Sequence, residues 1–209
     1  MKRKIAVAMM SFALATGANA VTFSSTAGAP DPGPAPGQTI VFDFNSPTPE
    51  LTGSFSLVTG SVSGVYAAPA GDATQYAVVP MAGQGLGVAN LDVSALGTIK
   101  TLSFYWGSID TYNTVEFFNG ATSVFALNGS MLPPANGDQG AGLTNRRVYF
   151  TFGPGETFDS IRFTSDAVAF EFDDIAVGVP EPASWAMMIL GFGMVGYAAR
   201  RRKTRVVAA

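Results

Sequence analysis

The chain has 209 residues, with 12 lysines and arginines against 15 aspartates and glutamates for a net charge of −3, and it contains neither cysteine nor histidine. The missing cysteines exclude disulfide bonds, and the missing histidines exclude a Ser-His-Asp triad and histidine-ligated zinc or haem. Chemistry that needs only oxygen groups remains open, namely calcium binding and glycoside hydrolysis by paired carboxyl groups.

The first 20 residues have the three parts of a secretory signal peptide. Residues 2–4 are Lys-Arg-Lys, residues 5–15 are apolar, and Ala18 and Ala20 are the small residues of an Ala-Asn-Ala cleavage site. We predict cleavage after Ala20 and a mature chain that begins at Val21. The alternative is a short N-terminal membrane anchor, which the well-formed cleavage site disfavours.

Residues 21–39 are predicted to form an arm before the folded domain. Residues 27–38 read Ala-Gly-Ala-Pro-Asp-Pro-Gly-Pro-Ala-Pro-Gly-Gln and show no apolar periodicity. Proline and glycine at this density are typical of an extended linker or a poorly ordered segment.

The region between residues 21 and 180 is strongly acidic. It holds only four lysines and arginines against 14 acids, so its net charge is about −10. Such a surface repels nucleic acid and anionic lipid, and we expect no nucleic-acid partner. The same charge suits calcium binding or a solvated extracellular protein.

From residue 40 the sequence alternates short β-prone segments with Gly, Pro, Asn and Asp. Leu102, Phe104 and Trp106 share one face of such a segment, and so do residues 148, 150 and 152. The pattern predicts an all-β fold, a single β-sandwich over residues 40–178, and we favour a jelly roll over an immunoglobulin-like sandwich. The predicted strands are residues 40–44, 53–58, 62–66, 75–79, 87–92, 100–106, 114–118, 122–127, 146–152, 160–164 and 167–177.

The last predicted strand contains an irregularity. Its sequence from residue 170 is Phe-Glu-Phe-Asp-Asp-Ile-Ala-Val. Phe172 and Ile175 both face the core only if the register slips by one residue between them, so we predict a β-bulge at Asp173 and Asp174.

This ending, with the opening Val-Phe-Asp-Phe of residues 41–44, resembles the terminal strands of carbohydrate-binding-module-like jelly rolls. The resemblance implies that the first and last strands lie side by side and that acids there hold a structural calcium. Asp43, Asp173 and Asp174 are the candidate ligands. The alternative is that these acids are solvent-facing charges that keep an edge strand from pairing with other chains.

The segment that follows residue 105 is the candidate glycan-binding site. Trp106, Asp110, Tyr112 and Asn113 combine aromatic rings with carboxylate, hydroxyl and amide groups, and loops on a rigid sandwich are where binding sites lie. The alternative, which we favour for the tryptophan, places Trp106 in the core because it continues the apolar face of its strand.

We expect no enzymatic activity. A glycoside hydrolase needs two carboxyl groups at a fixed separation across a cleft. The pairs that such an enzyme would use here are Asp110 with Glu116, or Glu156 with Asp159, and nothing in the sequence marks either pair as buried.

The C-terminal segment has three parts. Pro180-Glu181-Pro182 precedes an uncharged apolar run at residues 183–199, which a basic cluster at residues 200–203 closes. As a helix the run would span about 25 Å, with Trp185 and Tyr197 as aromatic residues near its ends and the basic cluster as a positive-inside flank. We predict a transmembrane helix; the alternative is a buried C-terminal core helix.

This tail resembles the PEP-CTERM sorting signal of proteins that Gram-negative bacteria export with an exosortase, in its PEPxxWA form. The resemblance implies that a membrane-embedded exosortase recognises the Pro-Glu-Pro segment, cleaves near it, and releases the protein or transfers it to the cell surface. It also implies a host that makes exopolysaccharide. The sorting residues are Pro180, Glu181, Pro182, Trp185, Arg200, Arg201 and Arg202.

The sequence thus predicts four segments: a signal peptide at 1–20, an arm at 21–39, a β-sandwich at 40–178 and a sorting tail at 179–209. We expect export through the inner membrane, anchoring there as a precursor, and a final place at the cell surface or in the extracellular biofilm matrix. The expected partners are the exosortase, the membrane before processing, and exopolysaccharide. The predicted role is structural or glycan-adhesive, and the alternative is a hydrolase of the exopolysaccharide matrix.

Overall fold

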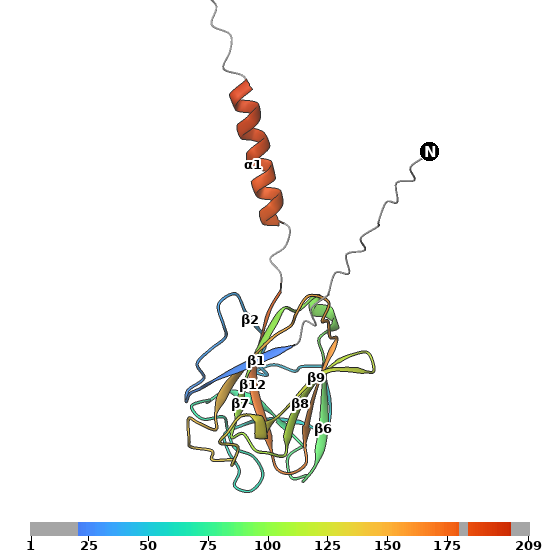
Figure 1. Ribbon diagram of the computed structural model, residues 1–209. Coiled ribbons are helices and arrows are strands. Elements are labelled where there is room, and N and C mark those ends of the chain that lie inside the picture. The colour runs from blue at the N-terminus through green and yellow to red at the C-terminus, as the bar shows by residue number, and fades with distance from the viewer. Residues whose placement is uncertain (1–20, 180–183, 202–209) are drawn as a thin grey trace, which may run out of the picture.

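Two antiparallel β-sheets pack face to face in the computed structural model, which describes residues 21–179 and 184–201 (Figure 1). The predicted all-β sandwich is confirmed. The signal peptide with Ala18 and Ala20 lies outside the described residues, and so do the Pro-Glu-Pro segment and Arg202. Those predictions stay predictions.

The larger sheet has seven strands and the smaller has five. The order in the larger sheet is β1 (Thr22–Ala27), β10 (Arg146–Thr151), β7 (Thr101–Gly107), β12 (Phe170–Gly178), β5 (Gln75–Val79) and β4 (Ser56–Thr59), with β2 (Thr39–Phe42) also paired to β12. The order in the smaller sheet is β3 (Leu51–Gly53), β6 (Gly87–Asp92), β11 (Ser160–Ser165), β8 (Asn113–Asn119) and β9 (Thr122–Asn128). Short 3-10 turns lie at Ser94–Leu96 and Gly129–Met131.

Phenylalanine rings fill much of the core between the sheets. Phe163 of the smaller sheet stacks on Phe172 of the larger sheet with ring centroids 3.9 Å apart, and Phe104 meets Phe163 edge-on at 5.8 Å. Every buried apolar side chain among the described residues lies between Val21 and Val177, so residues 21–179 contain a complete core and form a folding unit. The two predicted inward faces are confirmed by the burial of their residues, which are Leu102, Phe104, Trp106, Val148, Phe150 and Phe152.

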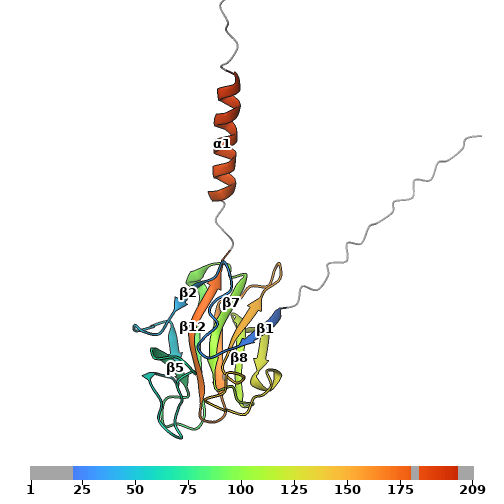
Figure 2. The same cartoon turned by 90° about the vertical axis from the view of Figure 1, so that its left-hand side faces the viewer.

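Strand β12 contains the bulge predicted at Asp173 and Asp174. Its register with β7 shifts after Asp173, and Asp174 has a φ of 51°, in the left-handed region. Phe172 and Ile175 consequently both face the core and are fully buried. Strand β2 pairs with the second half of β12, where Phe42 lies opposite Ile175, so the prediction that these two strands are neighbours is confirmed (Figure 2).

Two predicted strands are wrong. The segment 53–58 is not one strand but contributes to β3 and β4, which belong to different sheets. Gly53 ends β3 with a φ of 99°, and a Cβ there would collide with the backbone oxygen of Val88. Residues 62–66 form a tight loop closed by a bridge between Val62 and Tyr66.

The predicted arm is an ordered part of the sandwich. Strand β1 pairs with β10 at the edge of the larger sheet, and the Pro/Gly segment that follows is bound to the outer face of that sheet. Asp31 forms an ion pair with the buried Arg147, and the hydroxyl of Tyr149 donates to the carbonyl of Gly33 at 3.0 Å. Side chains from β10 therefore hold a segment that has no apolar periodicity of its own.

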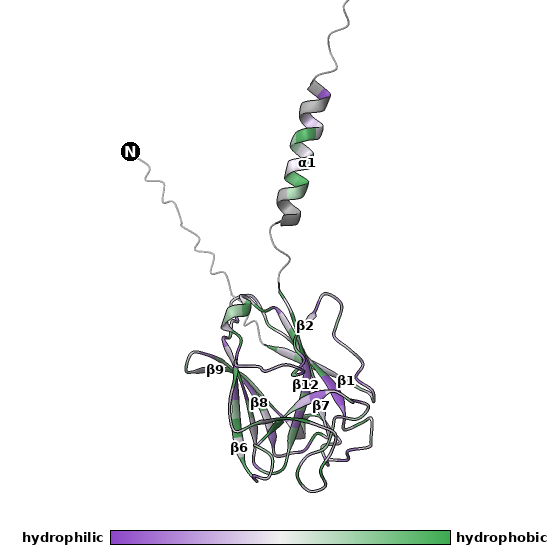
Figure 3. Cartoon of the chain, turned by 180° about the vertical axis from the view of Figure 1, so that it is seen from behind, coloured by the Kyte–Doolittle hydropathy of each residue, from purple (hydrophilic) through white to green (hydrophobic). Residues whose placement is uncertain are grey.

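The tail forms helix α1 (Ser184–Arg201), which is apolar in its middle and hydrophilic at its end (Figure 3). Among the described residues, no helix is both long and apolar enough to cross a membrane, so the predicted transmembrane helix is not supported. Its 18 residues span about 27 Å, less than the roughly 30 Å of a hydrocarbon core. The alternative of a buried core helix is wrong, because Ile189 and Phe192 are each 72% exposed.

Strand β12 defines two poles of the sandwich. At its last residue, Gly178 pairs with Thr101, and Thr101 pairs with Thr151, which pairs with Thr22 of β1. Both ends of the domain therefore lie at one pole, which we call the tail pole. Phe170 begins β12 at the opposite pole, which we call the loop pole.

Candidate functional site

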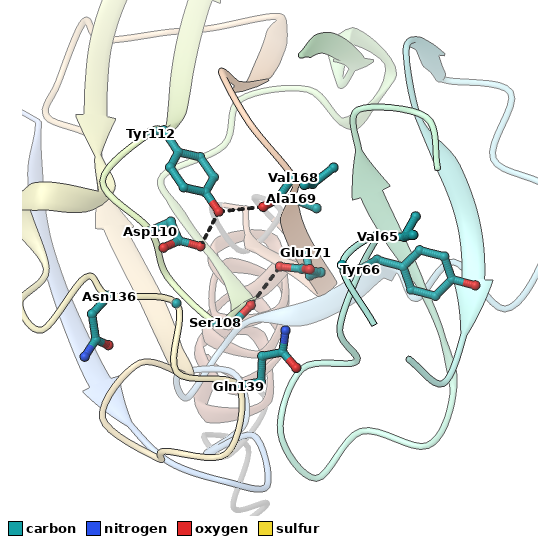
Figure 4. Close-up of a pocket in the computed structure, with 12 residues that line it drawn as sticks. Val65, Tyr66, Ser108, Asp110, Tyr112, Asn136, Gln139, Val168, Ala169 and Glu171 are labelled. Carbon is teal, nitrogen blue, oxygen red and sulfur yellow. Dashed lines mark hydrogen bonds between the residues drawn. The ribbon is translucent and has the colours of Figure 1, made fainter. Parts of the chain in front are cut away.

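Loops at the loop pole enclose a cleft of about 260 Å³ (Figure 4). The loops are those that connect β4 to β5, β7 to β8, β9 to β10, and β11 to β12. We call this pocket the Glu171 cleft, after its buried acid. Its lining residues with polar side chains are Tyr66, Ser108, Asp110, Tyr112, Asn136, Gln139 and Glu171.

Ser108 follows the last residue of β7 and has a strained backbone. Its φ of 34° lies in the left-handed region, which residues other than glycine seldom adopt. The side chain of Asn145 holds this conformation, because its Oδ1 accepts a hydrogen bond from the Ser108 N–H at 3.1 Å. The hydroxyl of Ser108 then donates to Oε2 of Glu171 at 2.9 Å (Figure 4).

Glu171 is the second residue of β12 and is only 2% exposed. Its Oε1 accepts the backbone N–H of Ala67 at 2.9 Å, and its Oε2 accepts the Ser108 hydroxyl. Burial raises the pKa of Glu171 to about 7; these hydrogen bonds oppose the rise, and the charge of Asp110 adds to it.

Asp110 and Tyr112 form a second hydrogen-bonded unit in the cleft. The Tyr112 hydroxyl lies 2.6 Å from Oδ2 of Asp110 and 2.6 Å from the carbonyl oxygen of Val168. A hydroxyl has one proton, so Tyr112 donates to one of these two oxygens at a time. Burial raises the pKa of Asp110, although the contact with Tyr112 acts in the opposite direction.

The predicted glycan-binding residues separate into two groups. Asp110 and Tyr112 line the cleft. The assignment of Trp106 to a binding surface is wrong, because its ring is fully buried in the core, as the favoured alternative predicts. Asn113 is also buried, and its side-chain amide donates to the carbonyl of Ala169 at 3.0 Å, so it supports the loop behind the cleft.

Ser108 lies within the candidate segment at residues 106–113, but sequence reasoning missed Asn136, Gln139 and Glu171. One signal was available for the last of these. The Phe-Glu-Phe alternation places Glu171 on the outer face of the larger sheet, where a carboxyl group is ordinarily solvated. Its burial depends on the segment around Ala67, which is more than 100 residues away in the chain.

The predicted calcium ligands are not assembled. Asp173 and Asp174 line a pocket of about 350 Å³ with Asp31 and Asp72, whereas Asp43 lies in a separate surface depression and accepts the N–H of Asn45. Burial and, next, the neighbouring Asp72 raise the pKa of Asp173 to about 9. Within residues 21–179 and 184–201, no three acidic groups are arranged to hold a metal ion.

The carboxyl groups that were candidates for a hydrolase have other contacts. Glu116 lies on β8 and does not line the cleft that contains Asp110. Glu156 and Asp159 each accept a backbone N–H of a nearby turn, at 2.9 and 2.8 Å. The cleft instead brings Asp110 close to Glu171.

Comparison with known proteins identifies the tail. Residues 178–203 match the PEP-CTERM protein-sorting motif, so the chain carries this motif, as its resemblance implied. No curated protein matches the chain. The chain is also similar to a solved structure described as "Structural basis for the promiscuous specificity of the carbohydrate-binding modules from the beta-sandwich super family", with 11% identity and a TM-score of 0.26. That match covers 77% of this chain and 56% of the other, little more than half of its length.

Proposed function

We propose that this protein is delivered to the cell surface by its tail and that its β-sandwich binds a sugar residue in the Glu171 cleft without turning it over. The PEP-CTERM sorting motif at residues 178–203 implies exosortase-dependent export and a final place at the cell surface. The sandwich is the part of the chain that remains to act there.

The polar lining of the cleft is the observation that supports a sugar ligand. The hydroxyls of Ser108 and Tyr112 and the amides of Asn136 and Gln139 offer donors and acceptors, and a sugar ring presents hydroxyl groups around its edge. The volume of about 260 Å³ is below the roughly 300–1,000 Å³ of pockets for drug-sized ligands. A single sugar residue suits that size.

The position of the cleft supports an adhesive role. The tail follows Gly178 at the tail pole, whereas the cleft lies at the loop pole, beyond the first residues of β12. The nine residues of β12 separate the poles by about 30 Å. A domain held by its tail therefore has its cleft at the end that faces away from the attachment point.

Titration of residues 21–179 with oligosaccharides tests the binding function. Asn136→Ala combined with Gln139→Ala removes two exposed amides of the cleft, and we expect about tenfold weaker binding, since each lost hydrogen bond costs roughly 0.5–1.5 kcal/mol. Asn119→Ala removes an exposed amide at the β8–β9 turn and serves as the control. Equal affinity in the double variant, or a wild type that binds no oligosaccharide, contradicts the proposal.

Fractionation of cells tests the delivery. Changing Glu181, or the basic cluster at residues 200–203, is expected to leave unprocessed precursor that does not reach the cell surface. Glu50→Gln changes an exposed acid of the domain and is the matched control. Normal surface delivery of the tail variants would show that the sorting assignment is wrong.

One observation favours glycoside hydrolysis as a second candidate function. Asp110 and Glu171 are two carboxyl groups in one cleft, and burial raises both pKa values, which is the property of a general acid. Incubation with oligosaccharides separates the two functions, because binding alone releases no new reducing ends. Release that disappears in Glu171→Gln would establish the hydrolase.

A further inference from the structure

The Glu171 cleft contains a buried carboxyl group without a cation. Glu171 is 2% exposed, and its two hydrogen-bond donors, the Ala67 N–H and the Ser108 hydroxyl, are both uncharged. Ionised groups inside proteins are ordinarily paired with an opposite charge. The ionised form of this site therefore lacks its counter-charge.

The arginines of the described domain make contacts outside the cleft. Arg147 is paired with Asp31, and Arg162 lies over the ring of Phe118 at 4.2 Å. Arg146 donates to the carbonyl of Leu143. Neither these three arginines nor Lys100 line the cleft, so the missing positive charge does not come from the domain.

The acceptor geometry leaves room for a cationic donor. A carboxylate can accept about four hydrogen bonds, and the donors from Ala67 and Ser108 leave part of that capacity of Glu171 open. Oδ1 of Asp110 accepts no hydrogen bond from the part of the chain that the structure describes, since Tyr112 contacts Oδ2. An ammonium group has three donors and no acceptor, which matches the open acceptor positions on the carboxyl oxygens of Glu171 and Asp110.

We propose that the Glu171 cleft selects glycans with a primary ammonium group, such as a hexosamine residue with a free amine, over neutral and carboxylated sugars. The inference rests on the proposed glycan-binding function and specifies its ligand. A neutral sugar leaves the buried carboxylate without a counter-charge, and a uronic acid adds a like charge. N-acetylation removes the positive charge and adds bulk in a cleft of about 260 Å³.

Calorimetric titration of residues 21–179 at pH 7 with glucosamine, glucose, N-acetylglucosamine and glucuronate tests the selectivity. We expect glucosamine to bind at least tenfold more tightly than glucose, N-acetylglucosamine to bind no better than glucose, and glucuronate to bind most weakly. Glu171→Gln is expected to bring the ratio of glucosamine to glucose affinity close to one. Asp110→Asn is a second variant, expected to reduce the ratio, and thermal melts check that both variants fold.

Glu116→Gln is the matched control, because it removes the same charge from a carboxyl group outside the cleft. It is expected to keep the full preference, which separates the cleft from the general attraction of an acidic domain for amines. Equal affinity of the wild type for glucose and glucosamine, or a preference for glucuronate, would overturn the selectivity and leave sugar binding intact. A wild type that binds none of the four sugars would overturn the proposed function as well.

Discussion

Replacing Glu171 with glutamine is expected to make the stability of the domain less dependent on pH. The amide oxygen of glutamine can accept the Ala67 N–H as the carboxylate does, and its NH2 group can donate to the Ser108 hydroxyl. The substitution therefore keeps the shape and the hydrogen bonds and removes only the ability to ionise.

The sign of the effect follows from proton linkage. Burial raises the pKa of Glu171 from 4.5 to about 7, so between these values the folded domain binds more protons than the unfolded chain. Stability is then lost as pH rises from about 4.5, and the loss is complete above about 7. For a shift of this size, the contribution of Glu171 to the free energy of unfolding falls by roughly 2–3 kcal/mol between pH 5 and pH 8.

Urea unfolding of residues 21–179 at pH 5 and pH 8 measures this difference. The decrease in the free energy of unfolding is expected to be roughly 2–3 kcal/mol larger in the wild type than in Glu171→Gln. Burial also raises the pKa of Asp173, but that group is present in both proteins and its effect cancels in the comparison. A variant that loses stability with pH as steeply as the wild type would refute the reasoning, because it would mean that Glu171 is solvated.

Two further predictions concern the arm and the core. Asp31→Asn leaves the buried guanidinium of Arg147 without its carboxylate. It is expected to lower the free energy of unfolding in urea by about 3 kcal/mol and to make residues 28–38 more sensitive to proteolysis. Unchanged stability would show that this ion pair does not hold the arm. Phe172→Ala removes a ring that stacks on Phe163 and is expected to lower the free energy of unfolding by about 4 kcal/mol. A decrease below about 1 kcal/mol would contradict the packing described for the core.

The sequence predicts those features that depend on neighbouring residues. The bulge at Asp173 and Asp174 follows from the requirement that Phe172 and Ile175 share the core face, and this requirement is visible within one strand. The core position of Trp106 follows in the same way from the alternation in β7. Periodicity reveals which residues face the core because successive side chains of a strand point to opposite faces of the sheet.

Features that depend on distant segments could not be predicted. The arm has a defined structure because the side chain of Arg147 binds Asp31, which lies 116 residues earlier in the chain. The Glu171 cleft exists because the segment around Ala67 and the strained turn at Ser108 both reach Glu171. A single sequence shows the acid between two phenylalanines but not the loops that cover it.

The placement of β12 has a mechanical consequence. The tail continues directly from this strand, which lies inside the larger sheet and has hydrogen-bonded partners on both sides, β7 on one and β5 and β2 on the other. A pulling force applied at Gly178 along the strand loads these ladders in shear, so that many hydrogen bonds share the load instead of opening one after another. A domain attached in this way resists extraction by flow or traction at the strand that forms the centre of its core.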